Sequence, residues 1–477
     1  NKISIDGSTS LSVSDNYKKR FESYGWSFIE VNGHNEKQIS KAITKASKSK
    51  KPTIISCKTI IGFGSPNKSG KASSHGSPLG DDEISLVRKK LKWNSSPFEI
   101  PQEILDEWRE IGNKGAQLEK NWLQIINKKN PKIKNELNKF KEKLDLSGLE
   151  SLIQKEKEKY FEAKPSLATR QCSMAAIEKI SAFFPQLIGG SADLSGSNNT
   201  KTNNSKIISS KNFNGNYIHY GVREHGMAAV MNGLALYGGI IPYGGTFLIF
   251  SDYCKPSIRL SALMGLKVIY VFSHDSIGLG EDGPTHQPIE QLTGLRAIPN
   301  LNVFRPADIS ETFECWEIAL KSENTPSAIA LSRQKVPYIN PKNSKENKCE
   351  KGAYVVNLTS HESNVTLIAS GTEVELALKV QDKLKENNIH SKVVSMPCIE
   401  LFDKQSEDYQ KDILEENSLI ITLEAGSVMS WQKYIKNKGA NLGIDKFGES
   451  APYKEIYKHF KLSEEDITNL IQKKLRE

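Results

Sequence analysis

The sequence is poor in cysteine, has no apolar run long enough to cross a membrane, and opens without the apolar segment of a secretory signal. Six cysteines are spread over 477 residues without a C-x-x-C pair, which excludes a disulfide framework and indicates buried, reduced thiols. Together with the missing signal, this usage predicts a cytoplasmic protein. The cysteines are Cys57, Cys172, Cys254, Cys315, Cys349 and Cys398.

One long stretch without charge, residues 226–250, is divided by glycines and a proline. A membrane-spanning helix needs about twenty continuous apolar residues, so we expect a helix, a turn and a short strand in a core, and no membrane partner. The net charge of +9 comes from lysines interleaved with acids, without the modules typical of nucleic-acid binding. We therefore expect a modest attraction for small anions and no nucleic-acid partner.

Apolar, strand-like runs alternate with helical patterns through most of the chain, which predicts α/β domains with mainly parallel sheets. A length of 477 residues leaves room for two or three such domains. The first region has a strand over 53–59 and a helix from Pro101 that we expect to stop near Gly115. We expect further strands over 216–220, 267–273, 303–305, 327–332, 365–370, 392–396 and 419–424, and a helix over 372–386.

The loop over residues 274–288 concentrates unusual chemistry. It follows a strand-like run and contains His274, Asp275, Asp282 and His286 among three glycines and two prolines. Titratable groups just past the carboxyl end of a strand are typical of the place where open α/β sheets bind substrates. We interpret this loop as part of a functional site.

From its residues alone, the loop has three other interpretations. Gly278, Gly280 and Gly283 match the G-x-G-x-x-G dinucleotide fingerprint, but Glu281 and Asp282 in its middle would repel a phosphate. The histidines and aspartates could ligate a metal, although their spacing matches no recognised ligand pattern. The loop could also be a histidine-capped turn with no chemistry.

Four other segments carry unusual residues, each with an ordinary structural explanation. Glu224 follows a strand and opens a helix, where an acid also favours the helix dipole. Phe247, Phe250 and Tyr253 are one helical turn apart, a spacing more typical of a core than of a cofactor pocket. The others are a glycine-rich loop over 189–198 and a pair of loops over 60–68 and 74–78.

Taken together and in this order, these segments resemble the transketolase family. The stretches GVREHGM, PYGGTF and HDSIGLGEDGPTHQP carry the resemblance, which extends over nearly the whole chain. It implies reversible transfer of a two-carbon ketol unit from a ketose phosphate such as xylulose 5-phosphate to an aldose phosphate such as ribose 5-phosphate. The transfer would use a thiamine diphosphate carbanion and belong to the pentose phosphate pathway. The implied domains are the later part of a diphosphate domain with the start of a linker over 1–134, a pyrimidine domain over 135–350 and a C-terminal domain over 351–477.

The resemblance assigns cofactor roles residue by residue. Glu224 matches the glutamate that hydrogen-bonds a pyrimidine nitrogen and helps the cofactor lose its C2 proton. Phe247, Phe250 and Tyr253 match the aromatic pocket that holds the pyrimidine ring. Asp193 matches a residue on the thiazolium side.

It also assigns contacts to phosphorylated sugars. Arg170 and Arg333 match phosphate-binding arginines, whose guanidinium groups bind phosphate bidentately. His75 matches a histidine at the junction of cofactor and substrate, where it would bind both and shuttle protons. The remaining matches are Ser197 and His274 for the phosphate, and Asp282 and His286 for the sugar hydroxyls, with His286 also a catalytic candidate.

One part of the family pattern would lie before residue 1. The family holds a divalent cation, Mg²⁺ or alternatively Ca²⁺ or Mn²⁺, through an aspartate in a GDG segment, a later asparagine and a backbone carbonyl. Asn1 and Ile3 match the asparagine and the carbonyl. Two protein ligands are too few for Mg²⁺. We therefore expect a transketolase without the first half of its diphosphate domain, which binds the cofactor weakly as it stands.

The resemblance further implies a homodimer with active sites across the interface, which the apolar stretch over 227–250 suits. The nearest alternative is 1-deoxyxylulose-5-phosphate synthase, which shares the fold, the cofactor and the glutamate. His274 before Asp275, followed by GLGEDGPTHQP, favours transketolase. A non-catalytic relative or fragment is the other alternative, and the intact Glu224 argues against it.

Overall fold

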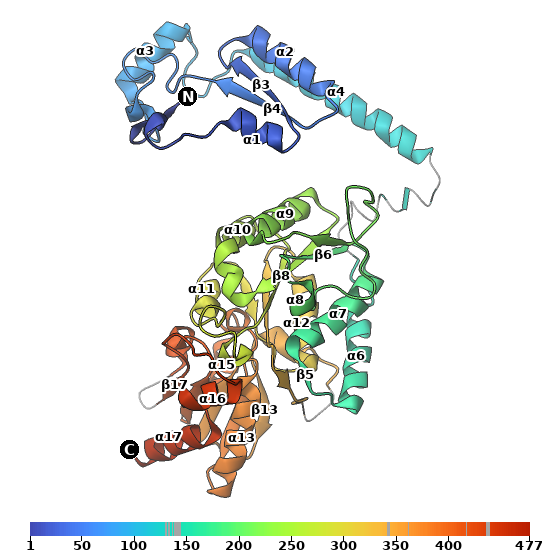
Figure 1. The fold of residues 1–477 in the computed structure, drawn as a ribbon, viewed down its shortest axis with the longest axis vertical. Helices are drawn as coiled ribbons and strands as arrows, with labels where there is room; N and C mark the ends of the chain where they lie inside the picture. The colour runs from blue at the N-terminus through green and yellow to red at the C-terminus, as the bar shows by residue number, and fades with distance from the viewer. Residues whose placement is uncertain are drawn as a thin grey trace. The chain divides into compact units, whose positions relative to one another are not determined.

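The computed structural model describes residues 1–128, 131, 134–135, 137, 145–340, 344–360, 362–415, 417–435 and 439–477. They form two compact units, Asn1–Lys128 and Lys129–Glu477. Strands and helices alternate in both units (Figure 1), which confirms the predicted α/β class. Of the helices within these ranges, none has the length and hydropathy needed to cross a membrane.

The first unit is built on a short βαβ segment. β3 (Ser27–Asn32) and β4 (Thr53–Lys58) pair in parallel, and α2 (Glu36–Ser47) connects them. Val31 and Ala42 are the buried apolar residues of this segment, so two strands and one helix enclose only a small core. The other elements are β1 (Ile3–Ser4), β2 (Gly7–Ser8), η1 (Thr9–Leu11), α1 (Tyr17–Ser23), η2 (Ala72–Ser74), α3 (Asp81–Leu91) and α4 (Gln102–Asn127).

Two expectations about this unit are wrong. Cys57 is exposed, whereas the other five cysteines are buried as expected, because Cys57 lies on a sheet of only two strands. Gly115 does not end its helix, since α4 continues through it and is 26 residues long. Apolar residues recur at helical spacing beyond the glycine, at Leu118 and Trp122, and one glycine inside a helix costs only about 1 kcal/mol.

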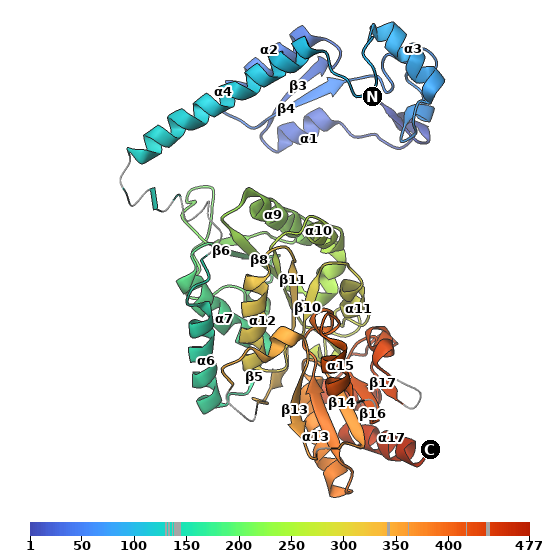
Figure 2. The same cartoon turned by 180° about the vertical axis from the view of Figure 1, so that it is seen from behind.

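The second unit contains a six-stranded parallel sheet in the order β10–β11–β9–β8–β6–β7. Ile269 and Val271 of β9 pack in the core with α6, α7 and α12, while Tyr270 and Phe272 pack with α9 and α10. Helices therefore cover both faces of the sheet (Figures 1 and 2), as alternating strands and helices predict.

The strands are β6 (Leu187–Ser191), β7 (Tyr217–His219), β8 (Ile241–Phe247), β9 (Ile269–Ser273), β10 (Asn302–Phe304) and β11 (Ser327–Leu331). The helices are α6 (Leu149–Ala163), α7 (Thr169–Phe183), α8 (Ser195–Asn198), α9 (Glu224–Tyr237), η3 (Leu248–Phe250), α10 (Ser251–Leu263), η4 (Ile277–Leu279), α11 (Gln291–Arg296) and α12 (Ile309–Lys321), with a β5 (Leu167–Ala168) and β12 (Lys335–Val336) pair beside them.

The loop expected over 189–198 begins as a strand. Gly189 and Gly190 belong to β6. The ring of Tyr243 fills the space beside Gly189, where a Cβ would lie 2.1 Å from the Tyr243 Cζ atom. The polar loop is therefore shorter than expected, and Asp193, with a φ of +62°, turns the chain from β6 into α8.

A second sheet has five strands in the order β13–β15–β14–β16–β17. β14 runs parallel to β15 and β16, and β13 is antiparallel at the edge. α13 contacts β14 and β15 on one side and α17 on the other (Figure 2). The strands expected over 365–370, 392–396 and 419–424 and the helix over 372–386 are confirmed. The elements are η5 (Lys348–Lys351), β13 (Tyr354–Leu358), β14 (Val365–Ala369), α13 (Glu373–Glu386), β15 (Ser391–Ser395), α14 (Ile399–Phe402), α15 (Glu407–Leu414), β16 (Leu419–Leu423), η6 (Val428–Tyr434), β17 (Ala440–Leu442), α16 (Tyr453–His459) and α17 (Glu464–Arg476).

Candidate functional site

Most of the candidate residues lie at the carboxyl edge of the six-stranded sheet. Asp193 follows β6, Phe247 ends β8, His274 follows β9 and Arg333 follows β11. Glu224 follows β7 and is the first residue of α9. Because parallel strands end at the same edge, loops that are far apart in the sequence meet there.

Three aromatic residues form one continuous cluster at this edge. The rings of Phe247 and Phe250 are stacked, with centroids 5.7 Å apart and planes 11° apart, and the ring of Tyr253 lies 5.9 Å from that of Phe250. They lie on β8, η3 and α10 rather than on one helix. Phe247 is buried, but Tyr253 is 66% exposed. The cluster is therefore a surface open to a planar ligand and not a core stripe.

Glu224 is half-buried at the start of α9, which packs against α10. Burial and, secondarily, the charge of Glu224 raise the pKa of Cys254 on α10 to about 12. The Glu224 carboxyl thus lies within electrostatic reach of the helix that carries Tyr253. A partly buried carboxyl beside an open aromatic surface can hydrogen-bond a ring nitrogen of a bound heterocycle.

A cationic group lies beside the aromatic cluster. Arg170 on α7 donates from Nη1 to the Ser197 carbonyl oxygen at 2.7 Å, and Arg333 donates from Nη1 to the Leu279 carbonyl oxygen at 2.7 Å. Burial, together with the positive charge of Arg333, lowers the pKa of Arg170. The Arg170 Nε atom is buried without a hydrogen-bond partner in the described part of the chain. An unsatisfied guanidinium donor fits an anionic ligand.

His274 joins the aromatic and cationic groups. Its ring centroid lies 3.8 Å from that of Phe247, and its φ of +60° is a left-handed conformation rare for a residue with a side chain. Burial, aided by the charges of Arg170, Arg333 and His286, lowers the His274 pKa to about 3. The imidazole is therefore neutral at physiological pH.

A directional chain of hydrogen bonds fixes the tautomer of this imidazole. Ser191 Oγ donates to the Gly245 carbonyl and accepts from Asn198 Nδ2, and Asn198 Oδ1 accepts from Ser273 Oγ at 2.7 Å. Ser273 Oγ lies 2.9 Å from His274 Nδ1 and has already donated its only proton. We therefore assign the proton to Nδ1, which leaves Nε2 as an acceptor. The sequence did not single out Ser273 or Asn198, although both are polar residues at the end of an element, β9 and α8 respectively.

The loop after η4 brings His286 to the aromatic cluster but leaves Asp282 exposed. The His286 ring lies 5.7 Å from that of Phe250, and its Nδ1 is 2.9 Å from Thr285 Oγ1. The three glycines of the loop begin no helix, since η4 is a three-residue turn. The dinucleotide interpretation therefore lacks the helix N-terminus that it needs.

Three candidates lie in the first unit. His75 is exposed after η2, and the Asn1 Oδ1 atom accepts a hydrogen bond from the Ile3 amide at 2.9 Å. The described residues include no group of three or more His, Cys, Asp or Glu side chains that could hold a metal ion. One amide oxygen and one carbonyl are too few for the octahedral coordination of Mg²⁺. By themselves, these residues do not fit a metal site.

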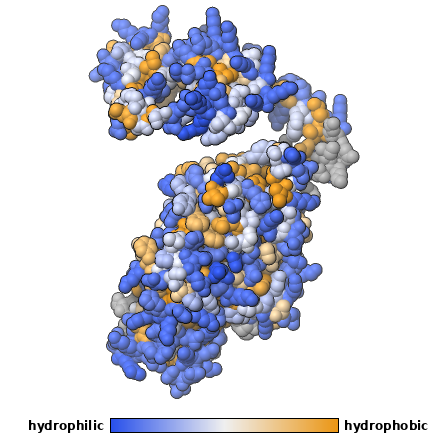
Figure 3. Space-filling model, viewed as in Figure 1, coloured by the Kyte–Doolittle hydropathy of each residue, from blue (hydrophilic) through white to orange (hydrophobic). Residues whose placement is uncertain are grey.

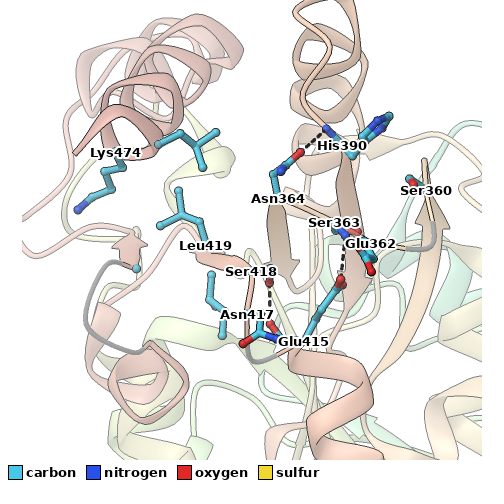
Figure 4. Close-up of a pocket in the computed structure, with 13 residues that line it drawn as sticks. Ser360, Glu362, Ser363, Asn364, His390, Glu415, Asn417, Ser418, Leu419 and Lys474 are labelled. Atoms are coloured by element: carbon cyan, nitrogen blue, oxygen red, sulfur yellow. Dashed lines mark hydrogen bonds between the residues drawn. The ribbon is translucent and has the colours of Figure 1, made fainter.

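A polar cavity of about 870 Å³ lies beside the five-stranded sheet, and none of the candidate residues lines it (Figure 4). Asn364, His390 and Ser418 lie around it, at the edge where β14, β15 and β16 begin. Its Glu415 carboxylate is paired with Lys392 Nζ at 2.9 Å. Open parallel sheets bind ligands at the opposite, carboxyl edge, so this cavity does not replace the site at the six-stranded sheet.

Three family models match the chain in sequence order. "Transketolase, thiamine diphosphate binding domain" matches residues 1–147, and "Transketolase, pyrimidine binding domain" matches residues 165–338. "Transketolase-like TK C-terminal domain" matches residues 352–463. The six-stranded sheet therefore corresponds to the pyrimidine-binding match and the five-stranded sheet to the C-terminal match.

Known proteins similar to this chain carry the same family name. The transketolase of Sinorhizobium medicae is 46% identical over 468 residues, which are 98% of this chain and 67% of the relative. The transketolase of Rhodobacter capsulatus is 43% identical over 473 residues, with 98% and 70% covered.

Two solved structures show the same similarity. The transketolase from Leishmania mexicana matches with a TM-score of 0.90 and 36% identity, over 100% of this chain and 70% of that chain. A Pichia stipitis transketolase in complex with sedoheptulose 7-phosphate matches with a TM-score of 0.87 and 36% identity, over 100% and 71%.

Proposed function

This chain belongs to the transketolase family of thiamine-diphosphate enzymes, which transfer ketol units, and we propose that the residues at the edge of its six-stranded sheet perform that transfer. The observation that carries the proposal is the meeting, at His274, of an open aromatic surface and a cationic group with an unsatisfied donor. The aromatic surface suits a flat heterocycle, and the cationic group suits a phosphate. A ketol transfer between sugar phosphates needs a site for each of these groups.

The aromatic surface and Glu224 are the proposed cofactor contacts in this unit. When bound, thiamine diphosphate supplies the carbon nucleophile that attacks the ketose carbonyl. Phe247, Phe250 and Tyr253 hold its pyrimidine by stacking, which the 11° angle between the planes of the first two rings supports. Glu224, half-buried at the start of α9, would hydrogen-bond a ring nitrogen of the pyrimidine. Asp193, in the turn between β6 and α8, would contact the thiazolium side of the cofactor.

The cationic group is the proposed phosphate site for ketose and aldose phosphates. Arg170 and Arg333 bind the phosphate oxygens, and the backbone beside Ser197, already held by Arg170, completes the site. The neutral His274 presents Nε2 as an acceptor for a protonated phosphate oxygen or a sugar hydroxyl. His286 and Asp282 bind the hydroxyl groups near the reacting carbons.

The first unit supplies the other proposed contacts. His75 binds at the junction of cofactor and substrate and moves protons there. Asn1 and Ile3 are the candidates for a divalent cation, Mg²⁺ or Ca²⁺ or Mn²⁺. The described residues alone do not fit such an ion, and the roles proposed for the second unit do not depend on it.

A homodimer in the cytoplasm is the proposed assembly. Large apolar side chains of α9 and α10 are exposed, and apolar residues gather over this part of the second unit in Figure 3. An exposed apolar surface of this kind is typical of a protein interface. The exposed side chains are Val230, Leu236, Tyr237, Leu260 and Leu263.

A substitution of Arg333 tests the site. Arg333→Met removes a cation beside the proposed phosphate position, so the KM for xylulose 5-phosphate should rise at least about tenfold. The KM for xylulose, which has no phosphate, should stay unchanged. Arg476→Met on the exposed end of α17 is the matched control. Equal KM changes for both sugars, or no change for either, would contradict the proposed site.

A further inference from the structure

A fully buried arginine connects the two sheets of the second unit. Arg305 follows β10, and its Nε donates to the Asp275 Oδ2 atom at 2.9 Å. Its Nη1 pairs with the Glu373 carboxylate and donates to the Ser370 carbonyl oxygen at 2.9 Å. Asp275 directly follows His274, whereas Glu373 begins α13 beside the five-stranded sheet. One guanidinium thus connects the loop over residues 274–288 to the five-stranded sheet and its helix α13.

The backbone leaves Arg305 little freedom. Its amide donates to the Pro397 carbonyl at 2.8 Å, and its carbonyl accepts from the Gly371 amide at 2.9 Å. Gly371 has a φ of +56°, and a Cβ there would lie 2.8 Å from Arg305 Cγ. The glycine therefore makes the space through which the arginine side chain passes.

The carboxylate of Glu373 is also held by hydrogen bonds that do not involve Arg305. Glu373 Oε1 accepts from the hydroxyl groups of Thr372 and Tyr457 at 2.7 Å each, and its Oε2 accepts from the Ala425 amide at 3.1 Å. Although burial opposes it, the carboxylates of Glu373 and Asp275 raise the Arg305 pKa, so the guanidinium stays charged. Arg305 therefore carries a permanent charge, and the Glu373 carboxylate that it binds is held in place by other hydrogen bonds.

The loop that Arg305 holds carries backbone strain, one proposed phosphate contact and the hydrogen-bond partner of another. The left-handed backbone of His274 persists only if its surroundings hold it there, and the next side chain, Asp275, is the one fixed by Arg305. The same loop presents the Leu279 carbonyl to Arg333 Nη1. A displaced Asp275 would therefore shift both His274 and the partner of Arg333.

From these contacts we infer that Arg305 is a positioning residue through which the C-terminal part of the chain sets the geometry of the phosphate site. Arg305 does not touch the substrate. Its guanidinium fork spans Asp275 and Glu373, which the single ammonium of lysine cannot do. This role rests on the proposed phosphate site, and it assigns to the five-stranded part a function in substrate recognition.

Arg305→Lys tests the inference, with Arg296→Lys as the matched control. Arg296 is also buried, and it donates to both oxygens of Glu424 at 2.7 and 2.8 Å, so its ion pair joins α11 to the end of β16 without contacting the loop over residues 274–288. Arg305→Lys should weaken binding of xylulose 5-phosphate about tenfold, a coupling ordinary for contacting residues. Binding of xylulose should not change. Arg296→Lys should lower the melting temperature without altering the ratio of the two affinities, measured by calorimetry.

A second variant decides the matter if Arg305→Lys does not fold. Asp275→Asn keeps the volume of the side chain and removes its charge, and it should produce the same selective loss. Where Arg305→Lys does fold, the double variant should bind xylulose 5-phosphate no more weakly than the weaker of the two single variants, because both substitutions act through the Arg305–Asp275 contact. Two results would overturn the inference. One is an equal loss of affinity for xylulose 5-phosphate and xylulose. The other is the same ratio of these two affinities in the Arg305 and Arg296 variants. If Arg333→Met still raises the KM for xylulose 5-phosphate but not that for xylulose, the proposed phosphate site is correct and does not depend on Arg305. If Arg333→Met changes both KM values equally or neither, the proposed phosphate site is itself wrong.

Discussion

The imidazole of His274 lies against the phenyl ring of Phe247, with centroids 3.8 Å apart and planes 31° apart. Phe247 ends one strand and His274 follows the next strand of the same sheet, since β8 and β9 pair directly. The contact joins the proposed cofactor surface to the proposed phosphate site. A ketose phosphate held by the cationic group would therefore have its carbonyl end directed towards the cofactor.

Glu224→Gln should lower kcat by at least about a hundredfold, because a carboxyl that exchanges a proton with the cofactor contributes two or more orders of magnitude. The free energy of unfolding should change by less than about 1 kcal/mol, the value of an acid in the first turn of a helix. Steady-state kinetics and urea unfolding measure the two effects.

Glu464→Gln is the control for this substitution. Glu464 also begins a helix, α17, but it lies outside the sheet edge that carries Glu224. It should leave kcat unchanged. A Glu224→Gln enzyme with undiminished kcat would reduce this residue to an acid that only begins a helix.

Phe250→Leu should weaken cofactor binding about fivefold to tenfold, since the substitution removes an aromatic pair and keeps an apolar side chain. Calorimetric titration with thiamine diphosphate gives the dissociation constant. Phe213→Leu is the matched control, because Phe213 is 77% exposed and its ring is outside the aromatic cluster. Equal affinities of the two variants would show that stacking on Phe250 does not hold the cofactor.

The folded protein should lose stability at mildly acidic pH through His274. Its pKa is lowered from an ordinary 6.5 to about 3, so between these values the unfolded chain binds more protons and stability rises with pH. Lowering the pH from about 7.5 to about 5.5 should remove about 1.4 kcal/mol through this group. The contribution is fully present above the unfolded pKa and is lost progressively as the pH falls towards the folded pKa.

The measurement is urea unfolding at both pH values, followed by tryptophan fluorescence, to which the buried Trp316 contributes. His274→Gln should reduce the loss on acidification by about 1.4 kcal/mol. His390→Gln replaces an exposed histidine and should not reduce it. If the His274→Gln variant loses as much stability on acidification as the parent does, His274 is not a buried neutral group.

The sequence could predict the parts of the fold that depend on local pattern. Runs of β-branched residues identified β9, β14 and β16 because such runs fit a buried strand. Part of the sheet edge could also be predicted, because His274 directly follows β9 and the titratable residues after it lie in one glycine-rich loop. Gly115 misled the helix prediction, since the helical spacing of apolar residues outweighed one unfavourable glycine.

The contacts that hold the site could not be predicted in the same way. Arg305 is separated by 30 positions from Asp275 and by 68 from Glu373, and Ser273 by 75 from Asn198. Nothing in the spacing of these residues encodes their pairing. They meet because loops from separate strands converge at one edge, a consequence of tertiary packing rather than of local sequence.

Leu263→Glu should dissociate the proposed homodimer. Leu263 is 71% exposed at the end of α10, and a carboxylate there would have to lose its water if this face meets a second copy of the chain. The dissociation constant, measured by sedimentation velocity over a concentration series, should rise at least about tenfold.

Leu475→Glu is the control for this substitution, because Leu475 of α17 is 40% exposed, and it should leave the dissociation constant unchanged. Activity at low protein concentration should fall in parallel with dissociation, because the proposed active site takes residues from two chains. A Leu263→Glu protein that sediments as the parent does would place any dimer contact elsewhere.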